Sequence, residues 1–134
     1  MITFVDTNVL LDVLLPDPRW GQNSKNSLDE AFRQGSLVIN KIIYAELAPQ
    51  FSSQTMIDDT LSTIGIRIIP LDRQSAYLAG SIWKNYKNLG GKRNRVLADF
   101  LIGAHAQIHA DRLLTRDRGF YKSYFNKLKI IYCE

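Results

Sequence analysis

The stretch ITFVDTNVLLDVLL, residues 2–15, predicts how the fold begins. Its first four residues form the apolar run of a buried strand, and Asp6, Thr7 or Asn8 can then cap a helix that stops near Pro16. Further along the chain, apolar runs continue to alternate with segments of helical periodicity. Because strands that alternate with helices are joined by parallel crossovers, the sequence predicts an α/β fold, a three-layer α/β/α sandwich with a central parallel sheet.

The remaining elements are expected to follow without a repeat or a linker, so residues 1–134 are expected to form a single domain with one core. Helices are expected from about Asn26 to Arg33 or Gln34, after the capping residue Asn40, and over residues 55–64, 73–89 and 96–110; strands are expected over 36–40, 66–70, 111–115 and 127–133. Pro49 is expected to end or kink the helix that follows Asn40.

Composition narrows the function classes. The chain carries 17 Lys and Arg against 13 Asp and Glu, a net charge of +4 that is compatible with a polyanionic partner. It contains neither an apolar run of membrane-spanning length nor the features of a signal peptide, so we expect a cytoplasmic protein without a membrane partner. The single cysteine, Cys133, has no partner for an intrachain disulfide, and we expect no catalytic role for it.

Four acids stand in strongly apolar contexts: Asp6, Glu46, Asp99 and Asp117. Asp6 and Asp117 follow predicted strands, and the other two lie in predicted helices. In a parallel sheet, ligands gather outside the carboxyl ends of the strands, where one topology brings all four acids together. Because carboxylates so placed repel one another until a cation binds, the set predicts a site for Mg²⁺ or Mn²⁺.

Each acid also has a purely structural explanation. Asp6 is well placed to cap a helix, and Asp117 in TRDRG is well placed to stabilise a turn. Glu46 and Asp99 are harder to explain in this way, because apolar residues surround both of them in the sequence. The functional interpretation therefore depends on the four acids as a set.

Four ordered motifs resemble those of the PIN-domain nucleases, especially the VapC-type toxins of toxin–antitoxin pairs. They are VDTNVLLDVL, the acid in the helix after the second strand, RVLADFLIGAHA and LLTRDRGF, which together span nearly the whole chain. The resemblance implies a metal-dependent endoribonuclease with Asp6, Glu46, Asp99 and Asp117 as its acidic site and metal ligands, and with Thr7, Asn8 and Thr115 as polar support. It also implies an antitoxin partner that blocks the groove beside the acids, and a homodimer.

Basic residues flank two of the acids. Lys92, Arg93 and Arg95 precede the helix of Asp99, and Arg116 and Arg118 flank Asp117. We expect these side chains to contact RNA phosphates, although a solvated charge run in a loop explains any one of them equally well.

The pair His105 and His109 shares a helix face at a spacing that metal sites use, but Ala106 stands where a zinc-protease helix carries Glu. The sequence therefore favours a packed or hydrogen-bonded role for His105, and a role for His109 as a cation at the helix C-terminus.

Other functions fit less well. A receiver domain would need an adjacent acidic pair after the first strand, and a haloacid-dehalogenase phosphatase would need Asp at the position of Asn8. The alternative from a different class is a non-catalytic RNA- or protein-binding domain with the same fold. Such a domain gains nothing from four mutually repelling acids, so the sequence favours a hydrolase that cleaves RNA.

Overall fold

Five parallel strands form one sheet at the centre of the molecule. The computed structural model describes residues 1–88, 90 and 97–133. Its strands are β1 (Ile2–Val5), β2 (Ser36–Ile39), β3 (Ile66–Ile68), β4 (Arg112–Thr115) and β5 (Ile130–Tyr132), in the order β3-β2-β1-β4-β5. Every pairing is parallel. The predicted parallel α/β architecture is therefore confirmed.

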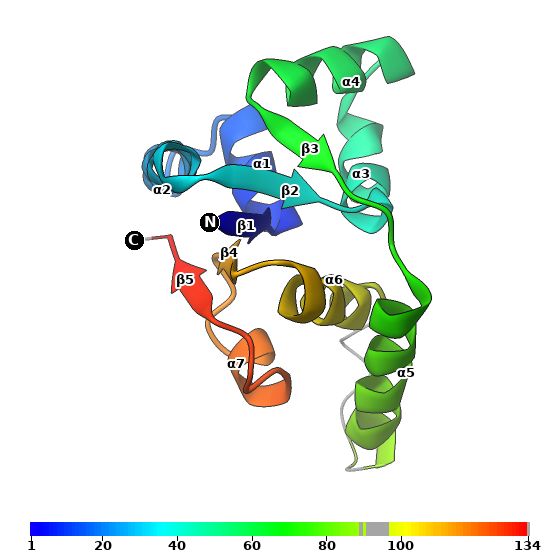
Figure 1. Cartoon of the computed structure of the whole chain (residues 1–134). Coiled ribbons are helices and arrows are strands. Elements are labelled where there is room, and N and C mark those ends of the chain that lie inside the picture. Colours follow the sequence, from blue (N-terminus) through cyan, green and yellow to red (C-terminus); the bar gives the residue numbers. More distant parts are fainter. Residues whose placement is uncertain (89, 91–96, 134) are drawn as a thin grey trace.

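Helices connect the successive strands. They are α1 (Thr7–Leu14), α2 (Gly21–Gln34), α3 (Lys41–Leu47), α4 (Gln54–Thr63), α5 (Arg73–Asn88), α6 (Leu97–His109) and α7 (Phe120–Tyr124), with a 3₁₀ turn, η1 (Ala48–Gln50), after α3. Figure 1 shows α1 to α4 grouped around the β3–β1 half of the sheet and α5 to α7 around the β4–β5 half. The chain first builds outward from β1 to β3 and then returns to β4 on the other side of β1. This reversal between β1 and β4 is where open parallel sheets bind ligands.

Side-chain caps fix the start of three helices. Asp6 accepts a hydrogen bond from the backbone N–H of Thr7 at the start of α1, and Asn40 accepts one from Ile43 at the start of α3. Ser53 caps α4 in the same way. The sequence predicted Asn40 as the cap of α3 and offered Asp6 as one of three candidates for the cap of α1. A 3₁₀ turn follows α3 at Pro49, as the position of that proline also predicted.

Two elements differ from the sequence-based expectation. Helix α2 begins at Gly21, five residues earlier than expected, after a turn in which the Asp17 carboxylate accepts hydrogen bonds from the N–H groups of Arg19 and Trp20. The residue before α2, Trp20, has no capping side chain, so no start signal is visible in the sequence. Helix α7 was not predicted, because its five residues are too few to show a period.

Helix α6, which carries Asp99, is held in position by aromatic packing in the core. Phe100 on α6 is fully buried, and its ring lies 5.0 Å from Phe120 and 5.3 Å from Tyr86, centroid to centroid. Aromatic pairs of this kind contribute about 0.5–1.5 kcal/mol each beyond their burial. One turn further along α6, Gly103 leaves room for the Phe125 ring, which a Cβ at this position would overlap. The start of α6 is therefore held against α5 and the α7 region.

Candidate active site

Asp6 lies at the end of β1 and is almost completely buried, with 5% of its surface exposed. Its Oδ1 accepts the N–H of Thr7 at 2.8 Å, and its Oδ2 accepts the Thr115 hydroxyl at 2.8 Å. The pKa of Asp6 is raised to about 6, chiefly by burial and to a smaller extent by the charge of Glu46, against the opposing effect of these hydrogen bonds. A carboxylate held in this way gains from a nearby cation, since a cation favours its charged form.

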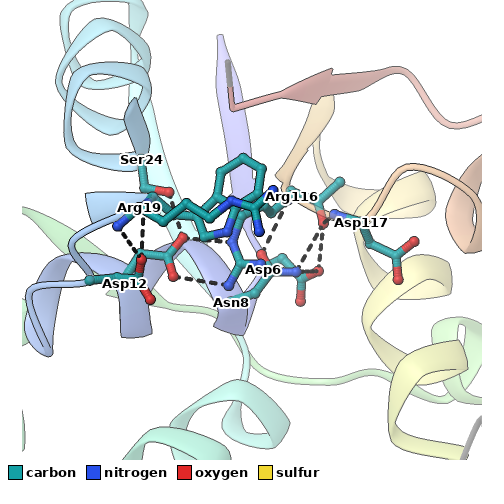
Figure 2. A network of polar contacts seen from close by, with 10 residues as sticks. Asp6, Asn8, Asp12, Arg19, Ser24, Arg116 and Asp117 are labelled. Carbon is teal, nitrogen blue, oxygen red and sulfur yellow. Dashed lines mark hydrogen bonds and ion pairs between the residues drawn. The ribbon is translucent and has the colours of Figure 1, made fainter. Parts of the chain in front are cut away.

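The end of β4 adds a second set of polar groups to the same place. Besides donating to Asp6, the Thr115 hydroxyl accepts the backbone N–H of Asp117 at 3.0 Å. Asn8 donates from Nδ2 to Asp6 at 3.3 Å and accepts the N–H of Arg116 through Oδ1 at 3.2 Å. The two strand ends are thereby tied together, as Figure 2 shows for Asp6, Asn8 and Asp117.

Asp117 is fixed by the backbone that follows it. Its Oδ1 accepts the N–H groups of Gly119 and Phe120, both at 3.1 Å, where α7 begins. This is the turn-stabilising role that the sequence offered as the alternative for Asp117. The same turn holds the carboxylate at the carboxyl end of β4, beside Thr115.

Glu46 reaches the site from α3. The Thr7 hydroxyl donates to its Oε1 at 2.6 Å, although Glu46 itself is exposed. Since Thr7 follows Asp6 directly, this bond aligns the exposed acid with the buried one. The charge of Glu46 acts on Asp6, which shows that the two carboxylates belong to one electrostatic cluster.

Asp99 joins the site from the first turn of α6. The hydroxyl of the buried Tyr121 connects it with the others: the pKa of Tyr121 is raised strongly, first by burial and then by the charges of Asp6, Asp99 and Asp117. The Tyr121 side chain in turn opposes the rise in the pKa of Asp6. The structure therefore brings the four acids that the sequence singled out to the carboxyl edge of the sheet, around Tyr121 and Thr7.

The spacing of the acids bears on what they can hold. Within the described part of the chain, no three of these four carboxylates have donor oxygens all within 4.8 Å of one another. Mg²⁺ usually keeps several water ligands and takes only one or two carboxylates directly. An all-oxygen donor set of this kind, with its buried acid of raised pKa, suits a hydrated hard cation.

The basic residues near the site differ in their surroundings. Arg116 forms a two-pronged ion pair with Asp12, at 2.7 and 2.9 Å, and stacks on Trp20 at 5.1 Å from the ring centre. Figure 2 shows this pair beside the acids. Arg118 is exposed and lies over Tyr132, 5.0 Å from its ring centre. Lys92, Arg93 and Arg95 lie outside the described residues.

Sequence reasoning missed two supporting residues. Asp12 is buried and accepts the Ser24 hydroxyl at 2.7 Å in addition to Arg116, so it anchors the loop after β4. An acid inside the apolar run VLLDVLL was the available signal. Tyr121 gave no signal, because an aromatic residue in a short segment is most often core.

Comparisons with known proteins agree with this geometry. Residues 3–126 match the PIN domain family, so the chain belongs to that family. The recognition of this family from the sequence is confirmed. No curated protein sequence matches the chain significantly. Among the described residues, no helix is both long and apolar enough to cross a membrane.

Several solved structures share this fold, including a toxin–antitoxin complex from Klebsiella pneumoniae, with a TM-score of 0.65 at 23% identity over 96% of this chain and 95% of the other. VapBC2 from Rickettsia felis, bound to a DNA fragment from its promoter, matches with a TM-score of 0.76 at 20% identity and covers 100% of both chains. FitAcB from Neisseria gonorrhoeae matches with a TM-score of 0.69 at 26% identity, over 98% of this chain and 96% of the other. DNA-bound VapBC from Salmonella typhimurium has a TM-score of 0.73 at 15% identity, over 100% and 99%.

Proposed function

We propose that this protein is a metal-dependent endoribonuclease and the toxin of a toxin–antitoxin pair. The observation that carries the proposal is the buried Asp6 carboxylate, whose pKa is raised to about 6 and which shares one sheet edge with three further acids. Such a carboxylate is unfavourable in isolation and is stabilised by a cation. A non-catalytic binding domain would have no use for this arrangement.

Mg²⁺ or Mn²⁺ is the cation that we infer. Asp6 and Asp99 are the proposed direct ligands, and Glu46 and Asp117 bind either directly or through water. The hydroxyls of Thr7 and Thr115 orient these acids, since they already donate to Glu46 and Asp6. When bound, a divalent cation activates a water molecule and stabilises the charge that develops on a phosphodiester.

The chain's own groups would then hold the reacting parts in place. Asp6 and Asp117 are fixed by backbone N–H groups and by Thr115, so their carboxylates need little reorganisation during the reaction. Glu46 is exposed and remains accessible to a substrate. The ion pair between Asp12 and Arg116 holds the loop after β4 beside these acids.

RNA is the proposed substrate, and basic side chains are the proposed contacts to its phosphates. Arg118 is exposed beside Asp117, and residues 92–95 precede the helix of Asp99 in the sequence. Arg116 remains in the proposed set, although its guanidinium is bound to Asp12. Contacts of this kind give affinity and position without reading the sequence.

The proposed protein partner is a small antitoxin. We propose that a segment of this antitoxin lies beside the acids and blocks them. An open hollow of about 380 Å³, lined in part by Tyr44, Phe51 and Ile57, offers a separate apolar surface on α3. We also propose a homodimer and a cytoplasmic location. A short neighbouring reading frame that encodes a DNA-binding protein would support the toxin assignment.

Cleavage of RNA tests the nuclease proposal. Purified protein should cut a structured RNA in the presence of Mg²⁺ and stop when the ion is chelated. Asp99→Asn should keep its fold and lose cleavage, whereas Asp59→Asn, an exposed control on α4, should cut like the wild type. If the wild type binds RNA without any cleavage in Mg²⁺ or Mn²⁺, the non-catalytic alternative holds.

A further inference from the structure

A second group of donor side chains converges away from the four acids, between the start of α5 and the last turns of α6. Asp72 directly precedes α5, and His105 and His109 lie four residues apart on α6 and share a face of that helix. One carboxylate oxygen and one nitrogen from each ring all lie within 4.8 Å of one another. Figure 1 shows the two helices packed side by side.

The buried His105 ring carries one nitrogen that has no hydrogen-bond partner among the described residues. His105 has 0% of its surface exposed, and its Nδ1 lies 3.1 Å from Nδ2 of Asn40. Its Nε2 is buried and has no hydrogen-bond partner. Burial and the neighbouring His109 lower the pKa of His105, against the opposing effects of Asp72 and of the backbone at Pro70. Since buried polar atoms are nearly always paired, this nitrogen requires an explanation.

The other two donors are already held beside it. Nε2 of His109 lies 2.9 Å from Oδ1 of Asp72. The Ser75 hydroxyl donates to Oδ1 of Asp72 at 2.6 Å, and the Ser75 N–H donates to Oδ2 at 3.3 Å. These contacts hold the pKa of Asp72 well below its usual range, chiefly through the Ser75 hydroxyl. The carboxylate is therefore ionised, and the exposed edge of His109 gives solvent access to the group.

We propose that Asp72, His105 and His109 form a binding site for a divalent transition-metal ion such as Zn²⁺, separate from the four acids. Two imidazoles and one carboxylate are a donor set that Zn²⁺ accepts, with water in the fourth position, whereas Mg²⁺ prefers oxygen alone. Ligand atoms around tetrahedral zinc lie about 3.3 Å apart, so the His109–Asp72 pair needs to open only slightly. The ion would join α5 to α6, the helix that carries Asp99.

Asn40 determines which nitrogen of the neutral His105 ring carries the proton before an ion binds. Because its Oδ1 accepts the N–H of Ile43, its amide presents Nδ2 to the His105 ring. The neutral ring then carries its proton on Nε2. Binding of the ion at Nε2 moves that proton to Nδ1, where it faces the donor Nδ2 of Asn40. Asn40 therefore weakens the binding in the wild type unless its amide turns and gives up the cap on Ile43. Asn40→Asp would supply the acceptor and still cap α3, so it should strengthen binding, as carboxylates behind ligating histidines do.

Calorimetric titration of the metal-free full chain with Zn²⁺ tests the site. The wild type should bind one Zn²⁺ tightly, and His109→Ala and Asp72→Asn should each weaken that binding by at least about 100-fold, because each removes a direct ligand rather than a hydrogen-bond partner of one. Asp72→Asn keeps an oxygen to cap α5. Gln74→Ala, an exposed neighbour, and Asp6→Asn, at the acidic edge, should leave this affinity unchanged. Asn40→Asp should raise it by about 10-fold.

Four results would overturn the proposal. The wild type could lack tight zinc binding, His109→Ala could bind as well as the wild type, or tight binding could disappear in Asp6→Asn, which would place the ion among the four acids. An affinity of Asn40→Asp at or below the wild type would exclude Nε2 of His105 as a ligand. Melting curves without metal establish that each variant is folded.

Discussion

Replacing Asp6 with Asn should stabilise the metal-free protein at neutral pH. The pKa of Asp6 is raised from 3.8 to about 6, chiefly by burial. Between these values the folded chain holds a proton that the unfolded chain has released, so the free energy of unfolding falls as the pH rises through this window. Above pH 6 the ionised, buried Asp6 lowers the free energy of unfolding by its full amount, about 3 kcal/mol for a pKa shift of this size.

Asparagine removes that penalty but loses part of the hydrogen bonding. One carboxylate oxygen becomes an NH₂ group, which accepts no hydrogen bond. The Thr115 hydroxyl can turn and accept from it, but the bond from Asn8 is lost, at about 1 kcal/mol. Asp6→Asn should therefore raise the free energy of unfolding by about 2 kcal/mol at pH 7 in the presence of a chelator. This gain should disappear below pH 4. Added Mg²⁺ should stabilise the wild type but not Asp6→Asn, because a ligand that binds only the folded state shifts the equilibrium.

Urea unfolding at pH 4, 5.5 and 7 measures these differences, with Asp59→Asn on the exposed face of α4 as the matched control. The stability of Asp59→Asn should follow that of the wild type at all three pH values. If Asp6→Asn is less stable than the wild type at pH 7 in chelator, and the gap does not change with pH, then Asp6 serves as a helix cap alone and the reasoning is refuted.

Three further changes test how the site is supported. Asp12→Ala should destabilise the protein by about 2 kcal/mol in urea unfolding, because it leaves Arg116 unpaired in a half-buried position, and an unchanged midpoint would contradict this. Gly103→Ala should cost about 1–3 kcal/mol, because the new methyl group overlaps Phe125; wild-type stability would show that α6 can shift. Replacing the three basic side chains of residues 92–95 with Ala should weaken RNA binding and flatten its salt dependence by roughly one slope unit per lost contact, and an unaltered slope would place the RNA elsewhere.

Much of the fold could be predicted because its signals are local. The strand-to-helix turn at Asp6 and the cap at Asn40 can be read directly from neighbouring residues, and both are found in the structure. The alternation of apolar runs with helical segments determines parallel crossovers. Helix α7 escaped prediction, because its start depends on hydrogen bonds to the Asp117 side chain rather than on a periodic pattern.

The site was predictable only in part, because sequence identifies acids but not what surrounds them. The strand-end positions of Asp6 and Asp117 follow from the topology. The pairing of Arg116 with Asp12 joins residues 104 positions apart, and no local pattern reports it. In the same way, HAQIH gave a pair of histidines without their third partner, since Asp72 reaches them only through the packing of α5 on α6.

A crystal structure with bound Mn²⁺ would test the shared metal site of the four acids most directly, since anomalous scattering locates the ion without any assumption about activity. The expected result is a manganese peak at the carboxyl edge of the sheet, with Asp6 and Asp99 as direct ligands and Glu46 or Asp117 within one water molecule. That peak should be absent from crystals of Asp99→Asn. A wild-type crystal with manganese only at Asp72 and the histidines, or with no ordered ion near Asp6, would contradict the proposed metal site.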